Sequence, residues 1–211
     1  MTLPQKLLDG YASFRRGRYA SEADRYSKLG LGQQKPSIMI IACCDSRAAP
    51  ETIFDAGPGE MFVMRNVANL VPPYAPDGKH HATSAALEFA VMGLGVKHVV
   101  VMGHGRCGGI NAIVAGGEPL SAGDFIGKWM SDVRDVAEVV RHDHDHGVGL
   151  QRAVELASVE HSLANLRTFP WLRMRENRGD VALHGTWFDI ALGELHSYEE
   201  GKRSWAVIPG A

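Results

Sequence analysis

The chain has 211 residues, of which 45% are hydrophobic and 22% charged, and its formal net charge is -2. These values predict one folded domain with a sizeable core, and they give no electrostatic reason to expect binding to nucleic acid or to a membrane. The sequence lacks a signal-like apolar leader and a run long enough to span a bilayer, and its three cysteines suit a reducing compartment, so a cytoplasmic location is expected.

The first 34 residues are predicted to form a helical arm. Apolar side chains recur there at helical spacing, at Leu3, Leu7, Leu8, Tyr11 and Phe14. Because this arm precedes the predicted core of residues 35–190, its apolar stripe needs another surface to cover it. Residues 191–211 are expected to form the C-terminal edge of the same domain.

The stretch 37–50, SIMIIACCDSRAAP, is an apolar run that ends in polar residues. Such a run predicts a strand buried on both faces, as in parallel sheets. If the extended backbone continues, Cys43, Asp45 and Arg47 share one face and Cys44 points to the other. Asp45 and Arg47 could alternatively form a structural salt bridge at the end of a strand.

A second strand is expected over residues 60–64, followed by a proline-rich loop over 66–76. Thr83 or Ser84 is predicted to be the N-cap residue of the next helix. This helix is expected to return the chain to the sheet in a right-handed crossover. The third predicted strand lies within 97–111, KHVVVMGHGRCGGIN, and a short helix is expected to begin near Cys107.

Three potential metal ligands follow these strands: Cys43, His104 and Cys107. Parallel strands bring such side chains together at their carboxyl ends. Two thiolates and one imidazole with a fourth position open are typical of catalytic zinc, whereas structural zinc has four protein ligands. A helix N-terminus beside Cys107 favours its thiolate. The alternative is that the three residues are incidental and that Cys43 is a small buried apolar residue.

A second alternative comes from Gly103, Gly105 and Gly108, which match a GxGxxG dinucleotide fingerprint with Asp124 downstream. The match is weak, because it lies in the third strand and its variable positions hold His104 and Cys107. Titration with NAD would test it.

Helical spacing recurs over 121–141 and 150–166, and the segment 142–146, with His142, His144 and His146, is expected to be a solvated loop. Pro170 interrupts the helical pattern, a fourth parallel strand is predicted over 181–184, and 187–208 is predicted to be antiparallel edge structure. The predicted fold is therefore α/β, with an open, mostly parallel sheet of four strands, antiparallel edge structure and flanking helices.

The Cys-x-Asp-Ser-Arg motif at 43–47 and the His-x-x-Cys-Gly-Gly motif at 104–109 together resemble the β-class carbonic anhydrases, in their plant-like subgroup. Residues 58–74 and 184–189 are similar to further segments of that family. The resemblance covers residues 34–189, most of the chain.

This resemblance implies reversible hydration of CO2 to bicarbonate through zinc-bound hydroxide, with one Zn2+ per subunit held by Cys43, His104 and Cys107. Asp45 and Arg47 match the catalytic pair of the family, in which the aspartate accepts a hydrogen bond from that hydroxide. The implied substrate pocket consists of Gln34, Phe62, Val67, the backbone of Gly108, and Phe89, where plant-like members have a tyrosine. The family also implies an active site at a subunit interface, in a homodimer or a dimer of dimers.

Two other functions share these residues. Relatives with the same zinc site hydrolyse carbon disulfide or carbonyl sulfide, and a non-catalytic bicarbonate sensor would also need a metal-binding pocket. Turnover measured with CO2 and with its sulfur analogues separates these functions.

Overall fold

The computed structural model describes residues 3–116, 118–143 and 148–210. It divides between Lys35 and Pro36 into two compact units. No helix among the described residues is long and apolar enough to cross a membrane.

The N-terminal unit contains α1 (Gln5–Arg16), α2 (Arg18–Ser21) and α3 (Ala23–Leu31). None of these helices has a buried residue, and four side chains of the predicted apolar stripe are exposed: Leu3, Leu7, Leu8 and Tyr11. The three helices are joined by an aromatic cluster in which the Phe14 and Tyr26 rings lie 5.7 Å apart and the Tyr19 and Tyr26 rings 5.3 Å apart. The helical arm expected from the sequence is present, but its apolar stripe lacks a cover within this unit.

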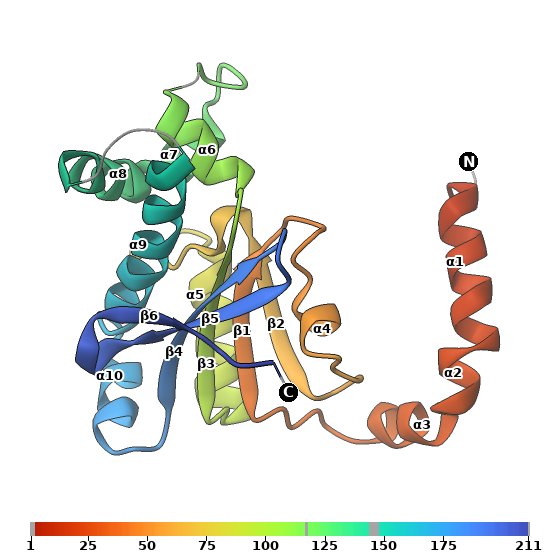
Figure 1. The fold of residues 1–211 in the computed structure, drawn as a ribbon. Helices are drawn as coiled ribbons and strands as arrows, with labels where there is room; N and C mark the ends of the chain where they lie inside the picture. The colour runs from red at the N-terminus through yellow and green to blue at the C-terminus, as the bar shows by residue number, and fades with distance from the viewer. Residues whose placement is uncertain (1–2, 117, 144–147, 211) are drawn as a thin grey trace. The chain divides into compact units, whose positions relative to one another are not determined.

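The second unit is built on a six-stranded sheet of order β2-β1-β3-β4-β5-β6 in the described part of the chain. The first four strands in that order are parallel, and β5 and β6 continue the sheet antiparallel (Figure 1). The strands are β1 (Ile38–Cys43), β2 (Met61–Asn66), β3 (His98–His104), β4 (Ala182–Asp189), β5 (Glu194–Glu199) and β6 (Ser204–Val207). This architecture confirms the predicted fold class.

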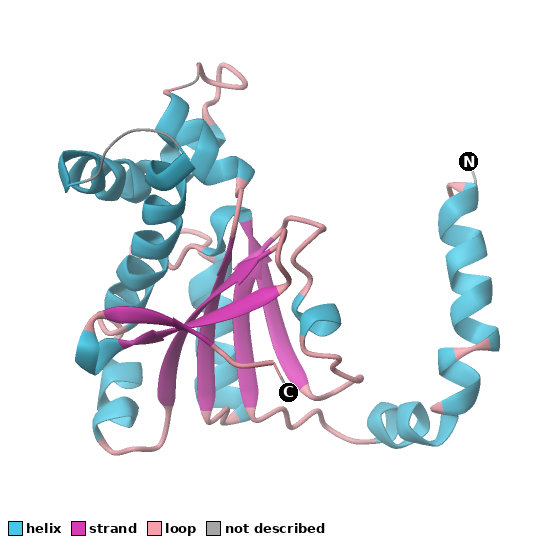
Figure 2. Cartoon of the chain, in the orientation of Figure 1, coloured by secondary structure: helices cyan, strands magenta, loops and turns pink. Residues whose placement is uncertain are grey.

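Helices cover the sheet and close its carboxyl end (Figures 1 and 2). One face is buried by side chains of α5, α9 and α10, and the opposite face is partly covered by α4. A third cluster joins α6, α8 and the start of α9 beyond the ends of β1 and β3. The helices are α4 (Pro50–Ile53), α5 (Ala82–Glu88), α6 (Gly108–Ala115), α7 (Phe125–Trp129), α8 (Ser131–Asp143), α9 (Val148–Leu166) and α10 (Pro170–Asn177); η1 (Val67–Asn69) and η3 (Glu200–Lys202) are 3-10 turns, and η2 (Phe89–Leu94) is a π-helical turn.

Several boundaries differ from the sequence-based expectations. The fourth strand continues to Asp189, beyond the predicted end at residue 184. Gly185 is the reason: it looks like a terminator, but it lies inside the strand, where an added Cβ would come 3.0 Å from Leu163 of α9. Trp187 therefore belongs to the parallel part of the sheet, and the prediction that it begins the antiparallel edge was wrong.

Two further predictions were wrong, the N-cap of α5 and the loop at His142, whereas the predicted interruption at Pro170 was confirmed, since α9 ends at Leu166 and α10 begins at Pro170. Helix α5 begins at Ala82 with His81 as its N-cap residue, so neither Thr83 nor Ser84 caps it. Pro170 begins α10 as its first residue, a position where proline costs no hydrogen bond. His142 lies in α8 rather than in a loop, and His144 and His146 lie outside the described residues.

Candidate metal centre

Three side chains meet at the carboxyl end of the parallel sheet. Cys43 is the last residue of β1, His104 is the last residue of β3, and Cys107 is the N-cap residue of α6. Since β1 and β3 are adjacent and parallel, their last residues lie together at the carboxyl end of the sheet. Only two residues separate His104 from Cys107, so the short turn between β3 and α6 places the Cys107 thiol beside the other two ligands.

This group has the composition and spacing of a zinc site. One ligand atom from each residue lies within 4.8 Å of the other two, and the residues are 5%, 1% and 2% exposed, respectively. The His104 ring places Nδ1 2.9 Å from the carbonyl oxygen of Gly105, which directs Nε2 toward the thiols. Among the described residues, Nε2 is a buried nitrogen without a hydrogen-bond partner. A buried imidazole nitrogen facing two buried sulfur atoms fits a tetrahedral zinc ion with one position open.

The protonation of the two thiols supports this fit. The hydrogen bond from Cys107 lowers the pKa of Cys43, and the same shared proton raises the pKa of Cys107. The Ala68 backbone N–H also donates to Cys43 Sγ, at 3.3 Å, from a residue with a left-handed φ of 62°. A bound dication would take the place of the shared proton and allow both sulfur atoms to be thiolates.

Asp45 and Arg47 lie beside the three ligands and are paired with each other. Arg47 donates from Nε to Oδ1 of Asp45 at 2.9 Å and from a terminal guanidinium nitrogen to Oδ2 at 2.7 Å. The same nitrogen donates to the carbonyl oxygen of Arg106 at 3.2 Å. Asp45 Oδ2 lies 3.9 Å from His104 Nε2, so the carboxylate reaches the edge of the ligand group.

The sequence predicted that strand alternation brings Asp45 and Arg47 together, and the structure shows a different cause. The strand ends at Cys43, and residues 46 and 47 form a turn in which the Arg47 backbone N–H donates to Asp45 Oδ1. Strand alternation therefore does not extend to Asp45 and Arg47; the side-chain–backbone hydrogen bond of the turn brings them together. The two adjacent cysteines nevertheless differ as expected in their surroundings, since Cys43 is buried and Cys44 is exposed.

Sequence analysis missed two charged residues that support the centre. Arg65 of β2 donates to the carbonyl oxygens of Cys43 and Asp45, at 2.8 and 2.6 Å. Glu155 of α9 accepts a hydrogen bond from the Cys107 backbone N–H at 2.9 Å. The available signal was a charged residue inside an otherwise apolar pattern: Arg65 within a strand, and Glu155 beside Val154 in the apolar stripe of a helix.

The predicted substrate-pocket residues do not all lie together within the chain. Val67 and Gly108 are near the centre: Val67 precedes Ala68, and Gly108 follows Cys107 as the first residue of α6. Phe62 is four residues before Asn66, the β-sheet partner of Cys43, and thus roughly 13 Å farther along β2. The Phe62 and Phe89 rings lie 5.8 Å apart, and Gln34 belongs to the N-terminal unit.

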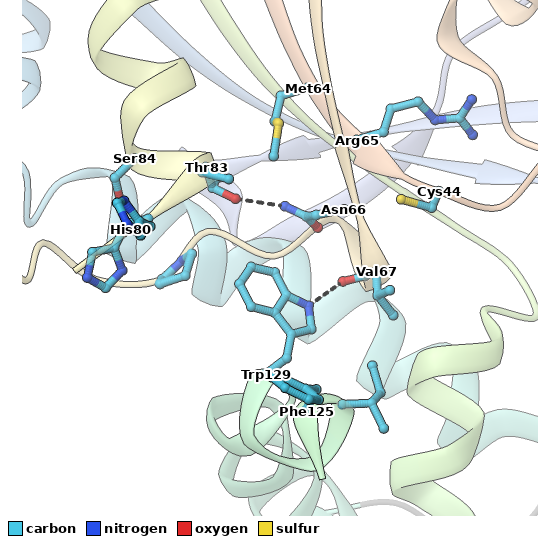
Figure 3. A pocket seen from close by; sticks show the side chains of 14 residues that line it. Cys44, Met64, Arg65, Asn66, Val67, His80, Thr83, Ser84, Phe125 and Trp129 are labelled. Carbon is cyan, nitrogen blue, oxygen red and sulfur yellow. Dashed lines mark hydrogen bonds between the residues drawn. The ribbon is translucent and has the colours of Figure 1, made fainter. Parts of the chain in front are cut away.

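A pocket of about 670 Å³ opens at the β2 edge of the sheet (Figure 3). Cys44 and Val67 line it from the side of the metal centre, and Thr83, Phe125 and Trp129 line it from α5 and α7. The Trp129 indole N–H donates to the Val67 carbonyl oxygen at 2.8 Å. The pocket is adjacent to the metal centre, but none of the three ligands lines it.

The glycines of the GxGxxG match have other roles. An added Cβ on Gly103 would come 2.8 Å from Val159, and one on Gly105 would come 3.0 Å from Trp187. These glycines permit close packing of β3 against α9 and β4. His104 lies between Gly103 and Gly105, and Cys107 directly precedes Gly108. The geometry favours the metal centre over a phosphate site.

Comparison with known proteins gives a consistent result. A family model described as carbonic anhydrase matches residues 38–195. The chain is 34% identical to β carbonic anhydrase 5, chloroplastic, of Arabidopsis thaliana, covering 85% of this chain and 60% of that protein. It is also 34% identical to a carbonic anhydrase of Pseudomonas aeruginosa, covering 96% of this chain and 90% of that protein.

Solved structures extend the similarity to the fold. The β-carbonic anhydrase CcaA superposes with a TM-score of 0.89 at 29% identity, covering 97% of this chain and 98% of that one. A tetrameric β-carbonic anhydrase of Sordaria macrospora superposes with a TM-score of 0.80 at 28% identity, covering 92% of this chain and 95% of that one.

Proposed function

The chain belongs to the β-carbonic anhydrase family, and from that premise we propose that it catalyses the reversible hydration of carbon dioxide to bicarbonate. The observation that carries this proposal is the buried group of Cys43, His104 and Cys107 beside the paired Asp45 and Arg47. A three-ligand zinc group with an open position is the catalytic arrangement.

Cys43, His104 and Cys107 would hold one Zn2+ per subunit, whose chemistry when bound is that of a Lewis acid that lowers the pKa of water. Arg47 then determines the state of Asp45. Its hydrogen bonds hold the pKa of the Asp45 carboxyl well below the usual range, and they outweigh the opposing effect of burial. Asp45 is therefore ionised at neutral pH, able to accept a hydrogen bond from the reacting water and so to orient a lone pair of its oxygen toward CO2.

The backbone of Gly108 and the side chain of Val67 are the substrate contacts that this chain supplies beside its own ligands. Gly108 is exposed at the first position of α6, where backbone N–H groups have no intrahelical partner and favour an anion such as bicarbonate. Val67 is 38% exposed and supplies an apolar wall next to it.

The test is CO2 hydration followed by stopped flow with a pH indicator, on protein of measured zinc content. We expect zinc-dependent turnover that is lost on chelation and restored by Zn2+. Carbonyl sulfide serves as a second substrate in the same assay. Preference for carbonyl sulfide, or no turnover of CO2 by protein holding one zinc, would contradict the proposal.

We further propose that the active unit is a homodimer, or a dimer of dimers, in which Gln34, Phe62 and Phe89 complete the site of the partner subunit. Phe62 lies on β2, the edge strand of the sheet, and at a distance from the Cys43 of its own chain. The described residues of α1 bury no side chain, and the Sordaria neighbour is a tetramer. An edge strand and an uncovered helix are suitable surfaces for a second subunit.

Subunit complementation tests this arrangement. Gln34→Ala retains zinc and Cys43→Ala retains Gln34, so a heterodimer isolated with two affinity tags has one complete site if Gln34 acts across the interface. We expect that heterodimer to have about half of the wild-type activity per dimer, although both parent homodimers are impaired. Activity no higher than the mean of the two parents would show that Gln34 does not act across the interface.

A cytoplasmic location is also proposed. It is supported by three free cysteines, of which two are candidate zinc ligands that must stay reduced. Cell fractionation followed by immunoblotting would test it.

A further inference from the structure

Two side chains of α9 form hydrogen bonds with the backbone of the metal ligand Cys107. Glu155 accepts the Cys107 backbone N–H through Oε1 at 2.9 Å, and the Gln151 side-chain amide donates to the Cys107 carbonyl oxygen at 3.3 Å. Gln151 and Glu155 are four residues apart and thus lie on the same face of the helix, where they also hydrogen-bond to each other at 2.9 Å. Both backbone polar groups of Cys107 are therefore bound by α9.

Glu155 is itself fixed from a second side. The Trp187 indole N–H, from β4, donates to Glu155 Oε2 at 3.2 Å, and both residues are buried, at 3% and 2% exposed. Three N–H groups thus converge on one carboxylate, from the Cys107 turn, from α9 and from β4. Burying a carboxylate costs free energy, so packing alone does not explain a glutamate at this position.

The turn that carries Cys107 needs external support. Arg106, the residue before Cys107, has a left-handed φ of 56°, a backbone conformation that is unfavourable for residues other than glycine. Cys107, the N-cap residue of α6, has its sulfur within the group of metal ligands, so the position of this residue sets the geometry of the centre. Such a backbone persists only when its surroundings hold it in place.

We propose that Glu155 is a positioning residue for the metal centre: it holds the backbone of Cys107 so that the sulfur stays within reach of Cys43 and His104 before the ion binds. The proposal rests on the proposed zinc function. Groups that orient metal ligands raise metal affinity by reducing the ordering that binding requires, and their loss costs 10- to 100-fold in affinity.

The variant Glu155→Gln is the sharpest test. A glutamine retains the size of the side chain but presents N–H groups in place of one oxygen, so either Trp187 or the Cys107 turn then meets a donor instead of an acceptor. Glu160→Gln is the matched control: Glu160 also lies on α9 and also accepts an indole N–H, from Trp205 at 2.8 Å. A general effect of glutamine on α9 would alter both variants.

The measurement is the zinc dissociation constant, obtained by competition with a chromophoric chelator, together with circular dichroism of the metal-free proteins. We expect Glu155→Gln to bind zinc about 10- to 100-fold more weakly, and Glu160→Gln to bind within about twofold of wild type. In the Co2+-substituted protein, Glu155→Gln should shift the visible d–d bands, which report ligand geometry, and Glu160→Gln should leave them unchanged.

A folded Glu155→Gln protein with wild-type zinc affinity and unchanged cobalt bands would overturn the proposal, even if its melting temperature fell. If Glu155→Gln does not fold, Gln151→Met tests the second hydrogen bond from α9 to the Cys107 backbone. Gln151 is only partly buried, so its substitution is expected to disturb folding less. Weaker zinc binding in that variant supports the proposal, and unchanged binding overturns it. None of these measurements uses CO2, so an inactive wild-type enzyme that binds zinc would refute the proposed function and leave this inference standing.

Discussion

At the scale of single residues, adjacent positions in the chain differ sharply in chemistry. Cys43 is buried among the metal ligands, whereas Cys44 is exposed in the wall of the neighbouring pocket (Figure 3). Asp45 is held by three hydrogen bonds from Arg47. Each of these differences leads to a separate test.

The ligand assignment predicts the zinc content of four alanine variants. Cys43→Ala, His104→Ala and Cys107→Ala should each lose most of the zinc and the activity, because two remaining ligands bind zinc weakly. Cys44→Ala should retain one zinc per subunit, since its side chain points away from the site. Metal analysis of the purified proteins checks this prediction, and zinc loss in Cys44→Ala would refute the assigned register.

Asp45→Asn should retain zinc but reduce kcat by roughly 100-fold or more, the scale for losing one oriented group in a catalytic site. An amide cannot take the acceptor role of the carboxylate on both oxygens, and its pairing with Arg47 is weaker. Stopped-flow hydration with measured zinc occupancy checks this prediction. A fully active Asp45→Asn enzyme would reduce the Asp45–Arg47 pair to a structural salt bridge.

His196 predicts a pH dependence of stability. Burial, with a contribution from Arg152, lowers the pKa of His196, whose ring packs edge-on against Trp187 with centroids 5.1 Å apart. In the unfolded chain a histidine titrates near pH 6.5. Below that pH the unfolded state binds more protons than the folded state, so the free energy of unfolding falls as the solution becomes acidic.

Wild-type protein should therefore lose stability between about pH 7 and pH 5.5, and His196→Phe, which retains an aromatic ring, should lose less over the same range. Urea unfolding of metal-free protein at several pH values measures both slopes. Parallel slopes for the two proteins would contradict a depressed His196 pKa.

At the scale of elements, glycine allows the close contact of β3 and β4 with α9. Gly103 and Gly185 lie on adjacent strands, and both would place an added Cβ within 3.1 Å of Val159. This packing sets the position of α9, the helix that carries Gln151 and Glu155. The two glycines therefore contact the same helix whose side chains hydrogen-bond to Cys107.

Gly103→Ala should lower the free energy of unfolding by about 1–3 kcal/mol, because the added methyl group overpacks the contact with Val159. Gly149→Ala is the matched control in the first turn of α9, where a Cβ would meet no heavy atom within 4 Å. That change should be neutral or stabilise by up to about 1 kcal/mol. Urea unfolding of both variants decides, and an equal effect in the two would exclude overpacking as the cause.

At the scale of the whole molecule, the exposed apolar side chains of the arm point to assembly. Leu3, Leu7 and Tyr11 are 63%, 57% and 63% exposed, and α1 itself buries no residue. Isolated helices of this length are marginal in water unless an apolar face is packed. A partner subunit is the proposed cover.

Deleting residues 1–17 should weaken subunit association and lower CO2 hydration together, while the zinc content of the remaining chain stays near one. Association is measured by light scattering across a range of protein concentrations. A truncated protein that is monomeric and fully active would show that the arm and the interface are dispensable.

The sequence by itself was sufficient for the fold class and the three proposed zinc ligands. Strand β1 is apolar on both faces and ends in Cys43, and a second apolar run ends in His104. Runs of this kind predict parallel strands, whose carboxyl ends lie at the same end of the sheet. The motifs at 43–47 and 104–109 were specific enough to indicate the family. These signals are local, and local spacing encodes them directly.

Only the tertiary structure decided what supports those ligands. Glu155 meets Cys107 across 48 positions of sequence, and Arg65 meets Cys43 across 22. No periodicity encodes such contacts, because they arise when separate elements pack together. The turn between Asp45 and Arg47 is a short-range example of the same limit: strand alternation predicted the right neighbours, but a side chain accepting a backbone N–H produced them.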